Sequence, residues 1–285
     1  MPPAQMPVSP RCRQSPPRAN AKVGYMRLRL SSSLLPFIAP RALHRPDVSS
    51  RRAFSLLLIA SVALLGACEG SYPAGPAANA ALVSDESVEV SQGDWIVFTP
   101  ADGEPESGWI FYPGGKVQAE AYAPLVRKFA EAGNLAVIVP MPLDLAIMSP
   151  MAADGVVQAF PGISTWGIAG HSLGGVAATQ FAYERPDVID ALALYAAYPQ
   201  EQHNLSDSQL PVLSLAGDLD QVMNWEKYEQ TKAVLPAGTR FELIEGANHS
   251  QFGDYGPQEG DGIASLTPDE QWSLTVALSL ALLED

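Results

Sequence analysis

The 285-residue sequence has only two cysteines, Cys12 and Cys68, and both lie in its N-terminal quarter. The region after Cys68 therefore has no thiol with which to form an internal disulfide or a cysteine-based metal site. Basic residues are also scarce there. Residues 68–285 contain 7 Lys and Arg but 30 Asp and Glu, a formal charge of −23. Nucleic acids and anionic membranes repel such a surface, so we expect neither as a partner.

The N-terminal region lacks an apolar run long enough to cross a bilayer as a helix, which takes about 20 residues. Its candidate is the mostly apolar 13-residue stretch 53–65, which directly follows two arginines. Residues 1–67 contain ten basic side chains and one acid, a formal charge of +9. A basic pair followed by a short apolar stretch is typical of a signal peptide, which we predict over residues 51–67.

The end of that stretch, Leu-Gly-Ala-Cys at residues 65–68, resembles a bacterial lipobox. In a lipobox, cleavage before the cysteine frees it to carry lipid. The resemblance implies lipidation of Cys68, a lipid-anchored tether over residues 68–82 and a place in the bacterial cell envelope. The alternative is ordinary signal-peptide cleavage, which gives a secreted or periplasmic protein.

Two further features of the N-terminus leave the export route and the start site open. Residues 50–54 resemble a twin-arginine export signal, although the usual downstream lysine is missing. Residues 1–50 are rich in Pro, Arg and Ser without periodicity. They form either a disordered leader or an artefact of an upstream start, in which case the true start is Met26.

The acidic region contains the motif Gly-His-Ser-Leu-Gly at residues 170–174, directly after a short apolar segment. Glycines on both sides of a serine permit a tight strand-to-helix turn that presents the hydroxyl beside a base. This is the pattern of a nucleophile elbow, and it makes Ser172 the candidate nucleophile. A glycine-rich turn with an incidental serine is the alternative.

Strands and helices alternate around this motif. We expect strands at residues 86–90, 95–98, 109–112, 135–139, 165–169, 191–195, 212–216 and 241–244, and helices at 122–130, 152–160, 225–235 and 269–283. The alternation predicts an α/β fold with a doubly wound, mostly parallel sheet and helices on both faces, in one domain over residues 83–285. Ligands bind such sheets at the C-terminal ends of the strands.

The motif in this setting resembles the α/β-hydrolase superfamily over about Val88 to Leu283, and in particular its small, cap-poor branch similar to dienelactone hydrolases. Dienelactone hydrolases themselves have a cysteine where this chain has Ser172. Asp220 follows Ser172 by only 48 positions, so we expect no large cap domain between them. The resemblance implies the chain order serine, acid, histidine.

The acid and base follow from that order, because each should come from a strand end. His249 lies just past the strand at 241–244 and is the candidate base. We expect His171 to point away from the site and His203, in a polar stretch, to be exposed. The family's spacing favours Asp220 as the acid, with Asp218 as the fallback.

The oxyanion hole should use the backbone N–H of Leu173 and a second N–H from residues 113–116, Pro-Gly-Gly-Lys. Many relatives have His-Gly at the start of this loop. Either Gly115 or Lys116 would donate, and a plain turn is the alternative for the segment.

The expected activity is that of a carboxylesterase-like serine hydrolase, which cleaves a small ester or related acyl substrate through Ser172, His249, Asp220 and an acyl-enzyme. No cofactor or metal is expected, and the membrane is a partner only through Cys68. The alternatives are a non-catalytic surface binding protein on the same fold and an acyltransferase. Apolar residues within 141–151 form either an acyl wall or core packing, and the polar stretch 248–261 either lines the pocket or forms a solvated turn.

Overall fold

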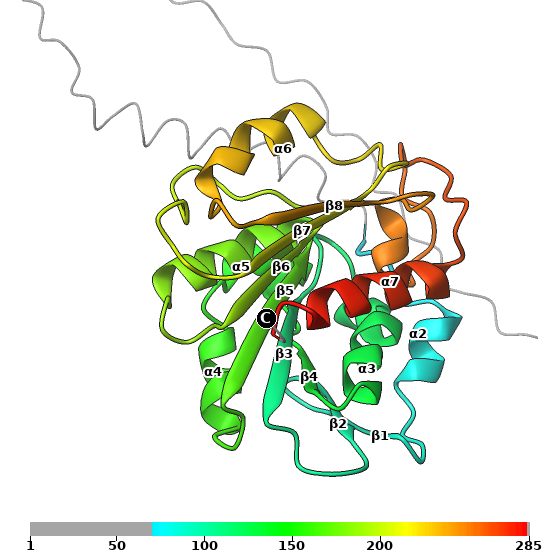
Figure 1. Ribbon diagram of the computed structural model, residues 1–285. Coiled ribbons are helices and arrows are strands. Elements are labelled where there is room, and N and C mark those ends of the chain that lie inside the picture. The colour runs from blue at the N-terminus through cyan, green and yellow to red at the C-terminus, as the bar shows by residue number, and fades with distance from the viewer. Residues whose placement is uncertain (1–69, 284–285) are drawn as a thin grey trace, which may run out of the picture. The chain divides into compact units, whose positions relative to one another are not determined.

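The computed structural model describes residues 70–283, shown in colour in Figure 1. The predicted leader, signal peptide and Cys68 lie outside the described residues. Within this range one eight-stranded sheet has the strand order β1-β2-β4-β3-β5-β6-β7-β8. The strands are β1 Val88–Gln92, β2 Ile96–Pro100, β3 Ser107–Tyr112, β4 Leu135–Ile138, β5 Thr165–His171, β6 Ala191–Tyr195, β7 Val212–Gly217 and β8 Arg240–Ile244.

The sheet is mostly parallel, as the sequence predicts. β2 pairs antiparallel with both β1 and β4, and every pair from β4 across to β8 is parallel. The connection from β6 to β7, residues 196–211, contains no inserted domain, in agreement with the absence of a large cap.

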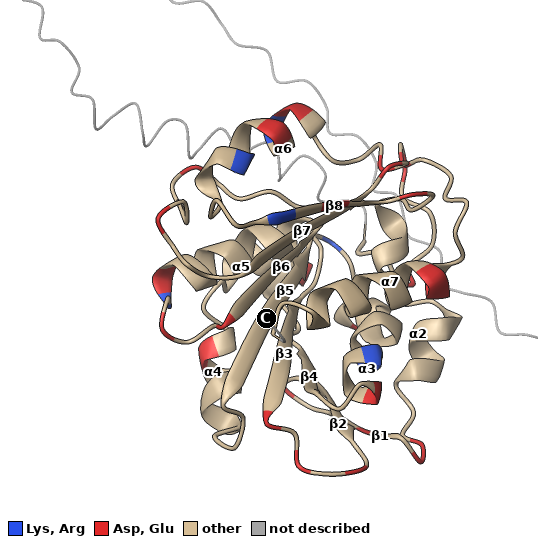
Figure 2. Ribbon diagram, in the orientation of Figure 1, with Lys and Arg blue, Asp and Glu red and all other residues tan. Residues whose placement is uncertain are grey.

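Helices cover both faces of the sheet. They are α2 Pro76–Ala81, α3 Ala123–Glu131, α4 Ala153–Ala159, α5 Leu173–Glu184, α6 Trp225–Thr231 and α7 Pro268–Leu280. α3 and α7 pack on one face and α4 and α5 on the other, which confirms the doubly wound architecture (Figure 1). Figure 2 shows the acidic residues spread over several helices and connecting loops.

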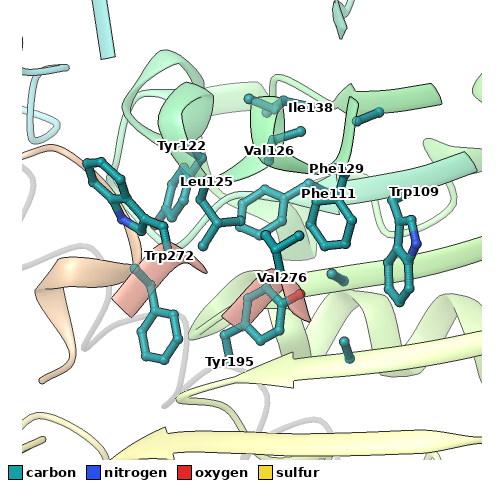
Figure 3. Close-up of a cluster of buried hydrophobic side chains, with 14 of the residues drawn as sticks. Trp109, Phe111, Tyr122, Leu125, Val126, Phe129, Ile138, Tyr195, Trp272 and Val276 are labelled. Atoms are coloured by element: carbon teal, nitrogen blue, oxygen red, sulfur yellow. The ribbon is translucent and has the colours of Figure 1, made fainter. Parts of the chain in front are cut away.

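Alternate side chains of a strand point to opposite faces of the sheet, so each central strand contributes residues to the core on both faces. In β3, Trp109 and Phe111 enter the core beneath α3 and α7, whereas Ile110 enters the core beneath α4 and α5. Trp109 stacks on Phe129 of α3 with ring centroids 4.9 Å apart, and Val276 of α7 lies in the same cluster (Figure 3). These two cores hold the sheet rigid, and its loops start from fixed positions.

The segment before β1 differs from the predicted tether. From Gly70 onward it packs on the domain: the Gly75 N–H donates to the Asp254 carbonyl at 2.6 Å, and Ala78 is fully buried. The Arg127 guanidinium of α3 donates to the carbonyls of Ala81 and Val83, at 3.0 and 2.8 Å. The small alanine side chains of α2 allow this close packing. The prediction of a tether as far as residue 82 is therefore wrong for residues 70–82.

Candidate active site

The strands from β3 onward place their following loops at one edge of the sheet, where parallel α/β folds bind ligands. Ser172 stands there between β5 and α5 with φ 50° and ψ −120°. A non-glycine residue in this region of backbone conformation is strained, and such strain persists where the surrounding structure enforces it. The Ser172 N–H is fixed by the Tyr195 carbonyl at 2.9 Å. Its side chain is therefore held by a rigid turn at the end of the strand.

The glycines on either side of Ser172 occupy positions where any side chain would collide with backbone. A Cβ at Gly174 would lie 2.0 Å from the Tyr112 carbonyl oxygen, and one at Gly170 would lie 2.4 Å from the backbone of Gly174. Both contacts are with backbone, which cannot move aside without displacing β3 or α5. As the glycines of the motif predict, the backbone of the turn approaches β3 and α5 too closely for a side chain at either position.

His249 and Asp220 come together from the loops after β8 and β7. Asp220 Oδ2 lies 2.8 Å from His249 Nδ1, and both side chains are buried. The other carboxylate oxygen accepts the N–H groups of Val222 and Met223 at 2.9 and 2.8 Å. Asp220 is thus held as an acceptor toward the imidazole. When Nδ1 of His249 donates to it, Nε2 is left with a lone pair.

The fallback acid, Asp218, lies elsewhere. Its side chain is exposed, and Oδ1 accepts the Gly246 N–H at 2.7 Å. Of the two aspartates, the structure brings only Asp220 to His249.

Ser172 and His249 line the same pocket, which has a volume of about 350 Å³. Ligand pockets typically fall between about 300 and 1,000 Å³. The remaining lining residues are mostly apolar: Leu173, Val176, Ala196, Ala197, Tyr198, Gln200, Val222, Met223 and Asn224.

The loop after β3 distinguishes the two candidate donors for an oxyanion hole. The Lys116 N–H already donates to the Asp144 carbonyl at 2.7 Å, so Lys116 is not suited to the role. Gly115 packs against Leu173, because a Cβ added to Gly115 would lie 2.9 Å from a Leu173 methyl carbon. Leu173 opens α5, whose first N–H groups have no acceptor within the helix. The geometry favours Leu173 and Gly115 as the pair.

Comparison with known proteins gives the family. The model of the alpha/beta hydrolase family matches residues 108–273, more than half of the chain. The chain belongs to the alpha/beta hydrolase family. No curated protein sequence matches it.

Solved structures share the fold of this alpha/beta hydrolase at low sequence identity. Est1E from Butyrivibrio proteoclasticus is 15% identical with a TM-score of 0.51, over 70% of this chain and 100% of that one. An esterase/lipase from an uncultured bacterium is 12% identical with a TM-score of 0.54, over 73% and 88%. TT1662 from Thermus thermophilus is 18% identical with a TM-score of 0.50, over 69% and 97%. Family and neighbours together support a hydrolase.

His171, expected to point away from the site of this alpha/beta hydrolase, instead lies against it. Its ring is buried, with its centroid 4.5 Å from that of His249. Its Nδ1 lies 2.8 Å from the Tyr122 hydroxyl, which also accepts the Gly114 N–H at 3.0 Å. The Tyr122 hydroxyl thus bonds the Gly114 N–H and Nδ1 of His171 at the same time. The three groups connect the elbow to the loop after β3.

We expect Tyr122→Phe to lower kcat for ester hydrolysis by about tenfold, because it releases the Gly114 N–H next to the candidate donor Gly115. KM should change less than kcat, since Gly115 is a candidate donor to the oxyanion rather than to the bound ester. Steady-state kinetics on a p-nitrophenyl ester measure kcat and KM separately for the wild type and the variant. Equal kcat in the two proteins would show that the hydroxyl has no effect on the loop.

Burial, and then the neighbouring His249, lowers the pKa of His171 well below 6.5. The folded protein therefore keeps His171 neutral while the unfolded chain takes up a proton below about pH 6.5. Below that pH we expect the free energy of unfolding to decrease as the pH is lowered. The contribution of His171 to this decrease is at most about 1.4 kcal/mol per pH unit. Urea unfolding at several pH values tests it, and His171→Asn should flatten the slope.

The loop that carries His249 is held by two polar side chains that sequence reasoning missed. The Asp261 carboxylate accepts the N–H groups of His249 and Ser250, at 3.3 and 2.8 Å. Gln271 of α7 is fully buried and bonds both the N–H and the carbonyl of Asn248. A glutamine within the packed face of α7 was the signal that could have identified this role. The stretch 248–261 thus supports the candidate base.

One further expectation needs correction, and of the two alternatives for residues 141–151 the acyl wall is not what the structure has. His203 is buried rather than exposed, with its ring 5.7 Å from that of Tyr183, because its loop folds back toward α5. Of the apolar residues within 141–151, none lines the pocket with Ser172. Met141 belongs to the core, while Leu143 and Met148 are exposed.

Residues 70–283 contain no group of three or more His, Cys, Asp or Glu side chains placed to hold a metal ion. Within the same range, no helix has the length and apolarity that a membrane span requires.

Proposed function

We propose that this chain is a serine hydrolase of the carboxylesterase type, with Ser172 as nucleophile, His249 as base and Asp220 as orienting acid. The observation that carries the proposal is the buried 2.8 Å contact between His249 and Asp220, at a pocket that Ser172 also lines from a strained turn. A histidine held by a carboxylate beside a presented serine is the arrangement that activates a hydroxyl.

The chemistry follows from these positions. Nε2 of His249 takes the proton of Ser172 as the hydroxyl oxygen attacks the ester carbonyl carbon, and Asp220 stabilises the imidazolium. The N–H groups of Leu173 and Gly115 stabilise the oxyanion. The imidazolium then protonates the departing alcohol, which leaves an acyl-serine. Water, deprotonated by His249, releases the acid and restores the serine.

Hydrolysis of p-nitrophenyl esters of rising acyl length by the full chain tests this function. We expect turnover, with acid and nitrophenol formed in equal amounts, and the length profile sizes the pocket. Added alcohols distinguish the acyltransferase alternative, which would convert the acyl group into a new ester. Absence of turnover on every ester would support the non-catalytic binding protein.

We also propose that the protein is exported and anchored through lipid at Cys68, as the lipobox resemblance implies. Metabolic labelling of cells with an alkyne fatty acid tests the anchor. We expect label on the wild-type chain and none on Cys68→Ser.

A further inference from the structure

The loop after β4, residues 140–150, exposes apolar side chains. Leu143 is 78% exposed, Met148 59% and Ile147 46%, and Pro140 and Pro142 are exposed beside them. Single exposed apolar residues are ordinary, but a group of them on one loop is typical of a surface that contacts a protein, a membrane or a ligand. We call residues 140–150 the apolar loop.

The apolar loop is held in its exposed form at a conformational cost. Leu143 and Asp144 have φ values of 57° and 53°, a region that non-glycine residues enter at a cost of about 1 kcal/mol or more each. Its one charged side chain, Asp144, accepts a hydrogen bond from the Ser71 hydroxyl, and its carbonyl accepts the Lys116 N–H at 2.7 Å. The surrounding structure thus fixes this loop rather than allowing it to fold inward.

The same contacts place the start of the described chain beside the apolar loop. Ser71 bonds Asp144, and the next residue, Tyr72, donates its N–H to the Lys116 carbonyl at 2.8 Å. An extended chain covers at most about 3.6 Å per residue, so Cys68 is within about 11 Å of Ser71 along the backbone. The proposed lipid site at Cys68 is therefore only three residues along the chain from Ser71, which bonds the apolar loop.

We propose that the apolar loop docks on a lipid surface and forms a second membrane contact beside the anchor at Cys68. The formal charge of −23 over residues 68–285 excludes attraction to anionic lipid, so the surface that fits is zwitterionic. The partner is a phosphatidylcholine-type bilayer, and the apolar side chains of the loop would insert into its outer few ångströms.

Docking on a membrane would also indicate which class of substrate the enzyme favours, an inference that rests on the proposed function. Lys116 bonds the apolar loop and adjoins Gly115, the candidate oxyanion donor, and Leu145 of the loop packs near Gly115. A docked enzyme therefore holds its catalytic edge at the bilayer. The substrate class it favours is acyl esters that partition into lipid.

A single fluorescent thiol at two matched positions tests docking. The full chain with Cys12→Ser and Cys68→Ser receives either Met148→Cys in the apolar loop or Leu243→Cys on β8. Both side chains are 59% exposed, which makes Leu243 the control. With phosphatidylcholine vesicles containing a nitroxide lipid, we expect quenching of at least about twofold at position 148 and none at 243.

Three outcomes overturn docking: no change at 148 on adding vesicles, equal quenching at both sites, or a label at 148 already shielded in buffer. The last would show that another part of the chain, or a second copy, covers the loop. A second variant, with Leu143, Ile147 and Met148 all replaced by serine, should lose vesicle binding by about tenfold and keep its melting temperature. Ser172→Ala should dock like wild type, so failure of the proposed function leaves this result unchanged.

Discussion

Replacing Ser172 with alanine should lower kcat for p-nitrophenyl ester hydrolysis by about 10⁴- to 10⁶-fold. Without the hydroxyl no acyl-enzyme forms, and only binding and the oxyanion hole remain to assist water. The change removes one oxygen from a half-buried position, so the melting temperature should stay close to wild type. Initial rates of the full chain and the variant, with active protein matched by melting curves, measure the effect.

Ser273→Ala provides the matched control. Ser273 is exposed on α7, a helix on the face that packs with α3, so its loss should leave kcat within about twofold. A Ser172→Ala variant with more than a few per cent of wild-type activity would contradict the nucleophile assignment.

Asp220→Asn should lower kcat by about 10³- to 10⁴-fold, the loss expected when an imidazole is held in the wrong tautomer. The amide oxygen can still accept the N–H groups of Val222 and Met223, which turns the amide nitrogen toward Nδ1 of His249. Nδ1 must then accept a proton rather than donate one. The proton moves to Nε2, where it blocks the base from accepting the proton of Ser172.

Asp218→Asn is the control for the same chemical change two positions earlier. Asp218 is exposed, and among the described residues its side chain bonds only the Gly246 N–H, so kcat of the variant should fall by no more than about threefold. kcat measured across pH for both variants separates the two aspartates. A large loss in Asp218→Asn with little loss in Asp220→Asn would reverse the assignment.

The fold was predictable because its signals are local. The apolar run at β4, the glycine-flanked Ser172 and the βα alternation predict a parallel sheet with the serine at its C-terminal edge, and the structure has these elements within a few residues of their predicted ends. The spacing after β7 favoured Asp220, which the structure places against His249.

The rest depends on partners distant in sequence. The choice between Gly115 and Lys116 turns on the carbonyl of Asp144, which lies 28 residues after Lys116. His171 appeared to be a passive neighbour of Ser172, because nothing near it reveals that Tyr122 would reach its ring. The alanine- and proline-rich segment before β1 has the composition of a linker, and bonds to distant residues such as Asp254 and Arg127 make it part of the domain.

Covalent labelling of the full chain by a fluorophosphonate tests the central claim most directly, because this probe reacts with a serine only where a base and an oxyanion hole activate it. We predict one adduct per chain, mapped by peptide mass to Ser172, and loss of labelling in His249→Ala. No adduct on folded protein, or an adduct on a different serine, would contradict the account.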